Sequence, residues 1–124
     1  MSPIFYEISS NAQIFGNSVW NSSGWGGIVV SSSGNVDVHH NTLAHTPALR
    51  AQLDNRERPS DAGTNVHFYD NQVAEPANNQ ATSWWQMSPD SNGNSDRNNP
   101  ALGRADGQRI VDALPIIGEQ LPRR

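Results

Sequence analysis

The sequence predicts an all-β fold built as a solenoid, in which short strands wind into coils that stack on one another. Residues 4–19 align without a gap on residues 28–43, and a third copy of the pattern ends in the segment 65–73. Apolar residues alternate within each copy, which is the spacing of strands and not of helices. Only 35% of the 124 residues are apolar and 16% are charged, so the composition suits neither a helical core nor a highly charged disordered tail.

Each copy contains the same elements in the same order. A first strand is followed by a short turn of Ser, Gly or Asn, a second strand, a lone Asn and one further apolar position. Alternation places one set of apolar residues inward, where successive coils stack about 4.8 Å apart. This set is Ile4, Tyr6, Ala12, Ile14 and Val19, then Ile28, Val30, Val36, Val38 and Leu43, then Leu49, Ala51, Val66, Phe68 and Val73.

The lone asparagines, Asn17, Asn41 and Asn71, are separated by 24 and then 30 residues. Asn tolerates the left-handed backbone conformation, so it suits a bend between two strands. Stacked Asn side chains also hydrogen-bond along the stacking axis. We therefore expect these three residues to form a structural Asn ladder at one corner of the coils.

The pattern weakens after residue 73. The segment SWWQM, residues 83–87, predicts a strand, and residues 80–102 then form a fourth coil in which Asn98 or Asn99 extends the Asn series. Residues 1–102 are thus expected to form the coils, with the clearest repeats in 4–73. Residues 103–124 are expected to form an irregular tail, or a cap on the last coil, with a short amphipathic turn that ends at Pro115.

The motif N-V-x-V-x-x-N-T-[VIL] occurs as NVDVHHNTL and NVHFYDNQV, with NAQIFGNSV as a weaker copy. In this motif the chain resembles the right-handed parallel β-helix of pectate-lyase-like proteins, many of them secreted by bacteria. The resemblance implies about three to four coils, an extracellular or cell-surface location and a polysaccharide partner. The chain opens directly on a core strand, so we expect either a C-terminal fragment of a longer solenoid or a solenoid that self-associates.

In polysaccharide-active proteins of the resembled fold, the sugar lies along the outer face of the first strand of each coil. Alternation points Phe5, Glu7, Val29, Ser31, Arg50 and Gln52 outward from these strands. The candidate substrate-binding residues are Trp20, Trp25, Arg50 and Gln52, since Trp rings offer flat surfaces to sugars. The alternative is that Trp20 and Trp25 pack down on the coil and shield it.

Charge is concentrated in the insert Asp54-Asn-Arg56-Glu57-Arg58, which lengthens the third repeat and is followed by Asp61. Lyases of the resembled fold use a basic residue to abstract a proton, and acidic residues hold Ca²⁺. Hydrolases instead need paired carboxylates. The candidate catalytic residues are therefore Arg56, Arg58, Asp54 and Glu7, with Ca²⁺ as cofactor only if the protein is a lyase. The alternative is a loop that holds only internal ion pairs.

Histidines offer a further candidate, because the repeat brings His39 beside Tyr69 and His67 beside Asp37 in neighbouring coils. Such pairs bind metals or move protons in other proteins. Since no metal-ligand spacing appears, we predict no metal site.

The net charge of −4 and the lack of a basic stripe argue against nucleic-acid binding, and no apolar run is long enough to span a membrane. Two functions remain: an extracellular carbohydrate-associated module, which binds a polysaccharide or forms part of a lyase or hydrolase, and a non-catalytic structural or adhesive segment.

Overall fold

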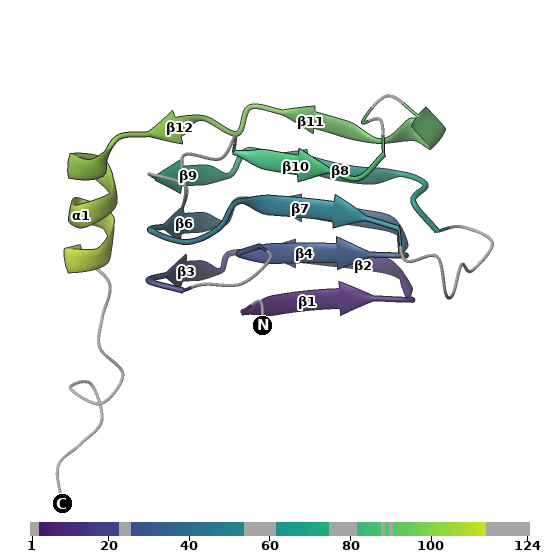
Figure 1. Ribbon diagram of the computed structural model, residues 1–124, viewed down its shortest axis with the longest axis horizontal. Coiled ribbons are helices and arrows are strands. Elements are labelled where there is room, and N and C mark those ends of the chain that lie inside the picture. Colours follow the sequence, from purple (N-terminus) through teal and green to yellow (C-terminus); the bar gives the residue numbers. More distant parts are fainter. Residues whose placement is uncertain are drawn as a thin grey trace, which may run out of the picture.

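A computed structural model describes residues 3–22, 26–53, 62–74, 82–87, 89 and 91–113 of the chain. Its strands form three parallel sheets of four strands each, and each of four coils contributes one strand to every sheet. Figure 1 shows the strands stacked in sequence order, from β1 at the bottom to β11 and β12 at the top. The predicted parallel β-helix is therefore confirmed.

Sheet A contains β1 (Ile4–Glu7), β4 (Ile28–Ser31), β7 (Leu49–Gln52) and β10 (Ser83–Trp85). Sheet B contains β2 (Ser10–Phe15), β5 (Gly34–His39), β8 (Val66–Tyr69) and β11 (Ser95–Arg97). Sheet C contains β3 (Ser18–Trp20), β6 (Thr42–Ala44), β9 (Gln72–Ala74) and β12 (Ala101–Leu102). A short 3-10 turn, Ser91–Gly93, precedes β11.

The core follows the predicted inward positions. In the second and third coils every predicted inward residue is buried in one hydrophobic cluster. The register of the strands is that of the gapless alignment, with Ile4 beside Ile28 and Val19 beside Leu43. In the first coil Ile4 and Ile14 are only half-buried, because β1, β2 and β3 are end strands of their sheets and pack against a coil on one side only.

The corner between sheets B and C holds a continuous row of asparagines, here called the buried ladder: Asn17, Asn41, Asn71 and Asn99. The Oδ1 of Asn41, Asn71 and Asn99 each accepts hydrogen bonds from the backbone N and the Nδ2 of the Asn one coil below, at 2.8–3.2 Å. The Nδ2 of Asn71 also donates to the carbonyl of Val38 at 3.0 Å. The fourth coil therefore extends the series through Asn99.

The left-handed residue at this corner is not the ladder Asn, so the expected reason for Asn at the bend is wrong. The residue just before it takes that conformation: φ is 69° at Gly16, 54° at His40, 55° at Asp70 and 53° at Asn98. Because the bend is made one position earlier, the ladder Asn keeps ordinary backbone angles, and its side chain forms the hydrogen bonds between coils.

A second row of asparagines, the exposed ladder, lies at the start of sheet B and consists of Asn11, Asn35 and Asn65. All three are left-handed, with φ between 53° and 65°. The Nδ2 of Asn35 donates to Asn11 Oδ1 at 3.2 Å, and the Nδ2 of Asn65 donates to Asn35 Oδ1 at 3.0 Å. At these positions Asn does serve the bend.

The fourth coil closes the upper end of the core with polar groups. Trp85 packs its ring on Phe68, with 4.8 Å between the ring centroids. Asp96 occupies an inward register position beside Phe68. Its carboxylate accepts hydrogen bonds from Trp85 Nε1 at 3.2 Å, from Asn99 Nδ2 at 2.6 Å and from the Ser83 hydroxyl. A charged group thus lies where the lower coils have Phe68, Val38 and Ile14.

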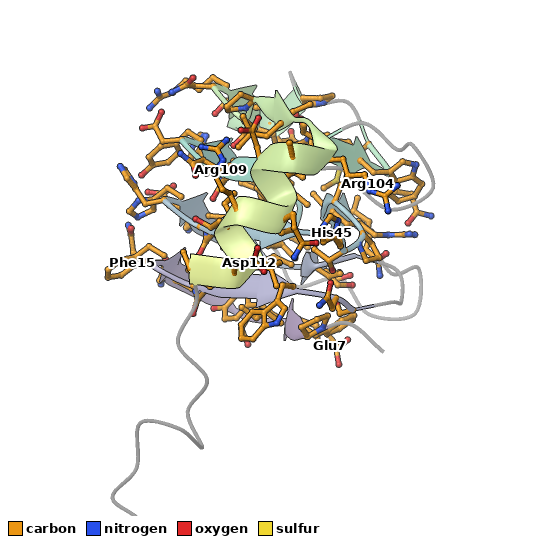
Figure 2. The ribbon with its side chains drawn as sticks, turned by 90° about the vertical axis from the view of Figure 1, so that its left-hand side faces the viewer. Glu7, Phe15, His45, Arg104, Arg109 and Asp112 are labelled. Atoms are coloured by element: carbon orange, nitrogen blue, oxygen red, sulfur yellow. The ribbon has the colours of Figure 1, made fainter. Side chains whose placement is uncertain are left out.

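Residues 104–113 form helix α1 (Arg104–Ala113), where a short turn was expected. Figure 1 shows that α1 does not cover the last coil; it runs back along the side of the solenoid, beside the ends of β6 and β9. Gly107 allows this close contact, since a Cβ there would lie 3.1 Å from His45 Cε1 and 3.2 Å from Ala74 Cβ. Figure 2 shows α1 in front of this side of the coils, with His45 next to it. Leu114 and Pro115 lie outside the described residues.

Candidate functional site

The outer face of sheet A, where a sugar was expected, is open only in part. Val29, Ser31 and Gln52 point outward by alternation, but their exposed fractions are 0%, 1% and 9%. The expectation that these three side chains face solvent is therefore wrong. One reason is that the chain entering β4 folds over Val29: a Cβ on Gly26 would lie 2.8 Å from Val29 Cγ2.

Two of the candidate binding residues on this face, Arg50 and Gln52, are engaged with their neighbours. The Arg50 guanidinium lies 3.8 Å from the centre of the Trp84 ring, and its Nε donates to Gln52 Oε1 at 2.7 Å. Gln52 in turn donates from Nε2 to Ser31 Oγ at 3.2 Å. Burial lowers the pKa of Arg50 from its usual value. Binding a sugar through Gln52 would require these contacts to break.

The remaining candidates are dispersed. Glu7 is exposed in the first coil, in the register column of Ser31 and Gln52, whereas Arg50 belongs to the neighbouring column. Trp20 is 42% exposed on β3, in sheet C and not in sheet A, so its ring does not shield the coil completely. Four further candidates lie outside the described residues: Trp25, Asp54, Arg56 and Arg58.

The outer face of sheet B is open along its whole length. We call it the sheet-B face and define it by two register columns: Gln13, Asp37, His67 and Ser95, and Phe15, His39, Tyr69 and Arg97. Every one of these residues is exposed or half-buried. The pairing of Asp37 with His67 and of His39 with Tyr69, expected from the repeat, is confirmed.

The second column is a continuous stack of planar groups. The Phe15 and His39 rings are 5.2 Å apart and inclined by 12°, and the His39 and Tyr69 rings are 4.9 Å apart and inclined by 4°. The guanidinium of Arg97 lies 4.6 Å from the centre of the Tyr69 ring. Phe15, at the lower left of Figure 2, marks the bottom of this stack.

Hydrogen bonds join the two columns and hold the side chains in place. Gln13 Nε2 donates to Asp37 Oδ2 at 3.1 Å, and the Tyr69 hydroxyl donates to the same oxygen at 3.4 Å. Gln13 Oε1 lies 2.7 Å from His39 Nε2. Burial raises the pKa of the Tyr69 hydroxyl, and the negative charge of Asp37 raises it further.

These contacts place a proton on one nitrogen of His39 and orient the histidine rings. Since Gln13 turns its NH₂ toward Asp37, its oxygen faces His39, and His39 Nε2 carries the proton. His39 Nδ1 lies 2.7 Å from His40 Nδ1, so one of these two nitrogens donates to the other. At the upper end His67 Nδ1 lies 2.6 Å from Ser95 Oγ. The sheet-B face is therefore an ordered array of rings, donors and acceptors.

The sequence contains a signal for this array. Each member of the stacked column stands two positions before an asparagine of the buried ladder. The repeat that aligns the asparagines therefore also aligns Phe15, His39, Tyr69 and Arg97.

Within the described ranges, no group of three or more His, Asp or Glu side chains is placed to hold a metal ion. Asp54 and Asp61, the residues expected to hold Ca²⁺ in a lyase, lie outside those ranges. No helix in the described part of the chain is long and apolar enough to cross a membrane. No protein-family model, curated protein or solved structure matched the chain when it was compared with them.

Proposed function

We propose that this protein is a carbohydrate-binding module of the pectate-lyase-like β-helix type, that it works outside the cell or on its surface, and that it self-associates. One observation carries the binding proposal: the sheet-B face repeats a planar group and a hydrogen-bonding group on each of the four coils.

The spacing of this face suits a polysaccharide lying along the solenoid axis. Successive parallel strands are about 4.8 Å apart, which is close to the length of one sugar unit in an extended chain. Each sugar would therefore meet the same pair of columns. Because Gln13, Asp37 and His39 already hold one another in place, little conformational entropy is lost when hydroxyl groups bind to them.

The ring of Phe15 adds an apolar contact at the lower end of the face. It is 59% exposed, and His39 covers one side of it. The exposed part of the ring is suited to the C–H face of a sugar ring. Arg97, at the upper end, would attract a uronate carboxylate. The face is thus matched to a neutral or acidic polysaccharide.

Binding fits this face better than hydrolysis. Glycosidases place two carboxyl groups roughly 5–10 Å apart. Among the described residues of the two sheet-B columns, Asp37 is the only one with a carboxylate, so the second carboxyl group is missing. The Asp37 carboxylate already accepts hydrogen bonds from Gln13 and Tyr69. The lyase hypothesis, with Arg56 or Arg58 as base and Ca²⁺ held by Asp54, stays a prediction for residues outside the described ranges.

Affinity electrophoresis and calorimetry against neutral and uronate polysaccharides test the proposal. We expect Tyr69→Ala and His39→Ala each to weaken binding at least about tenfold, equivalent to about 1.4 kcal/mol. The matched control is Trp84→Ala, which removes an exposed aromatic ring from sheet A and should leave affinity unchanged. Circular dichroism would verify that each variant is folded.

The opposite pattern, with loss of binding in Trp84→Ala alone, would move the site to sheet A. If no polysaccharide binds, the non-catalytic structural or adhesive alternative replaces the carbohydrate-binding proposal. Formation of unsaturated uronides that depends on Ca²⁺ would instead favour a lyase.

A further inference from the structure

The lower end of the solenoid, formed by the first coil, is unusually apolar. Four of the five large hydrophobic side chains described as exposed belong to it: Phe5, Ile8, Phe15 and Trp20. The inward residues Ile4, Tyr6, Ala12 and Ile14 are only half-buried there. A hollow of about 370 Å³ lies in the first coil, lined in part by Ile4, Asn17, Val19 and Trp20. Glu7 is the only charged residue between 3 and 22.

The same end also presents strand edges and two side-chain amide groups, one of which can accept a hydrogen bond and the other donate one. β1, β2 and β3 are each an edge strand of their sheet. Within the described residues, nothing donates to Asn17 Oδ1, whose counterparts in Asn41 and Asn71 each accept two hydrogen bonds. At the start of β2, Asn11 Oδ1 accepts from Asn35 Nδ2, while Asn11 Nδ2 has no partner in the part of the chain that the structure describes. The lower end thus has a free acceptor after β2 and a free donor at its start.

We infer that a second copy of this chain docks on the lower end, with β2 pairing antiparallel to β2 of that copy around a two-fold axis at Ile14. This inference rests on the self-association part of the proposed function. Asn11 and Asn17 are equally distant from Ile14, so the axis places each Asn11 Nδ2 opposite the Asn17 Oδ1 of the other copy. An interface of this kind is self-complementary and closes at two chains.

The pairing continues the contact that the coils already make with one another. Between the first and second coils, inward side chains stack while strand edges and Asn amides hydrogen-bond. The lower end offers all three kinds of group again. With only Glu7 charged, two copies approach without strong repulsion.

A head-to-tail stack, which would grow into a filament, is blocked at the upper end. Asp96 lies in the same register column as Ile14, Val38 and Phe68. Stacking another first coil there would bury this carboxylate against apolar side chains, which is costly. The lower end therefore pairs with its own copy.

Analytical ultracentrifugation tests the inference on the full chain, which should sediment as a dimer. Ile14→Asp introduces a carboxylate at the lower end, in the same register column in which Asp96 lies at the upper end. We expect this variant to sediment as a monomer while it keeps its β-sheet circular dichroism. Arg97→Asp, on the fourth coil, is the control and should remain dimeric.

A second test does not depend on how well Ile14→Asp folds. The chain has no cysteine, and opposed Cα atoms in antiparallel strands are about 4.5–5.5 Å apart, within disulfide range. Ile14→Cys should therefore form a disulfide-linked dimer under mild oxidation, and Arg97→Cys should not.

Three results would overturn the inference. If Arg97→Cys cross-links and Ile14→Cys does not, the chain self-associates through its upper end. If the chain dimerises and neither variant cross-links, another surface is used. If the chain is a monomer at all concentrations, the self-association proposal fails as well. None of these results bears on polysaccharide binding, which is measured separately.

Discussion

The two asparagine ladders use the same residue for different physical reasons. In the buried ladder, Asn71 has an exposed fraction of 0%, and its amide makes hydrogen bonds to the coils below and above. In the exposed ladder, Asn35 is open to solvent and takes a φ of 53°. The first position needs the amide, whereas the second needs a residue that tolerates the left-handed conformation. Residue type alone therefore does not reveal the role.

The largest expected difference comes from Asn71→Ala. This change removes the acceptor for Asn41 N and Nδ2 and the donor to Val38 O, all in a buried corner. We expect the free energy of unfolding to fall by about 2–4 kcal/mol, because buried polar groups lose their partners. Urea denaturation followed by circular dichroism measures it.

Asn17→Ala is the control within the same ladder. Asn17 is half-buried in the first coil, and the Oδ1 of Asn41 keeps the hydrogen bond from the Asn17 backbone. We expect a loss of about 1 kcal/mol or less. Equal losses at positions 17 and 71 would show that burial does not set the value of a ladder residue.

A smaller difference in stability is expected when Asn is replaced by Gly or by Ala, and it should distinguish the exposed ladder from the buried one. Asn35→Ala should cost about 1 kcal/mol, because Ala resists the left-handed conformation. Asn35→Gly should change stability by no more than about 0.5 kcal/mol, since Gly adopts that conformation readily. Asn41→Gly should be as harmful as Asn41→Ala, because the amide is lost in both. If Asn35→Gly lowers the free energy of unfolding more than Asn35→Ala does, the left-handed conformation is not the reason for Asn at position 35.

The smallest effect concerns the side chains beside the exposed ladder. The pKa of Tyr69 is raised by burial and then by Asp37, so Asp37→Asn should lower it toward the ordinary value of about 10. Ultraviolet titration of the tyrosines measures this. Since the folded-state pKa is the higher one, the contribution of Tyr69 to stability is complete below that ordinary value and is lost as pH rises above it. An unchanged titration in Asp37→Asn would show that Asp37 does not act on Tyr69.

The fold and core could be predicted from the sequence because they depend on local rules that recur in every coil. Alternation decides which residues point inward, and a gapless alignment decides which residues stack, as for Ile4 with Ile28. The aspartate at inward position 96 obeys no such rule. It is tolerated because it lies at the open side of an end coil, where Trp85 and Asn99 donate hydrogen bonds to it.

The candidate site was harder to predict because exposure depends on packing between distant segments. Alternation gives Val29 and His39 the same outward direction, yet Val29 is covered by the chain at Gly26 and His39 is not buried. The sequence pattern favours Asn41 as the left-handed residue of its corner, because Asn commonly takes that conformation. In the structure His40, the residue directly before it, takes it instead. Neither outcome follows from local spacing.

The corners of the coil differ in how much extra chain they accept. Between sheets A and B, β4 and β5 are joined by two residues, Ser32 and Ser33, whereas β7 and β8 are joined by residues 53–65. Despite this, Val36 still lies beside Val66, and β5 and β8 stay in register. The corner with the buried ladder stays short in every coil. A solenoid of this design can gain new surface by insertion at one corner without a new core, which makes that corner a natural place to graft a loop.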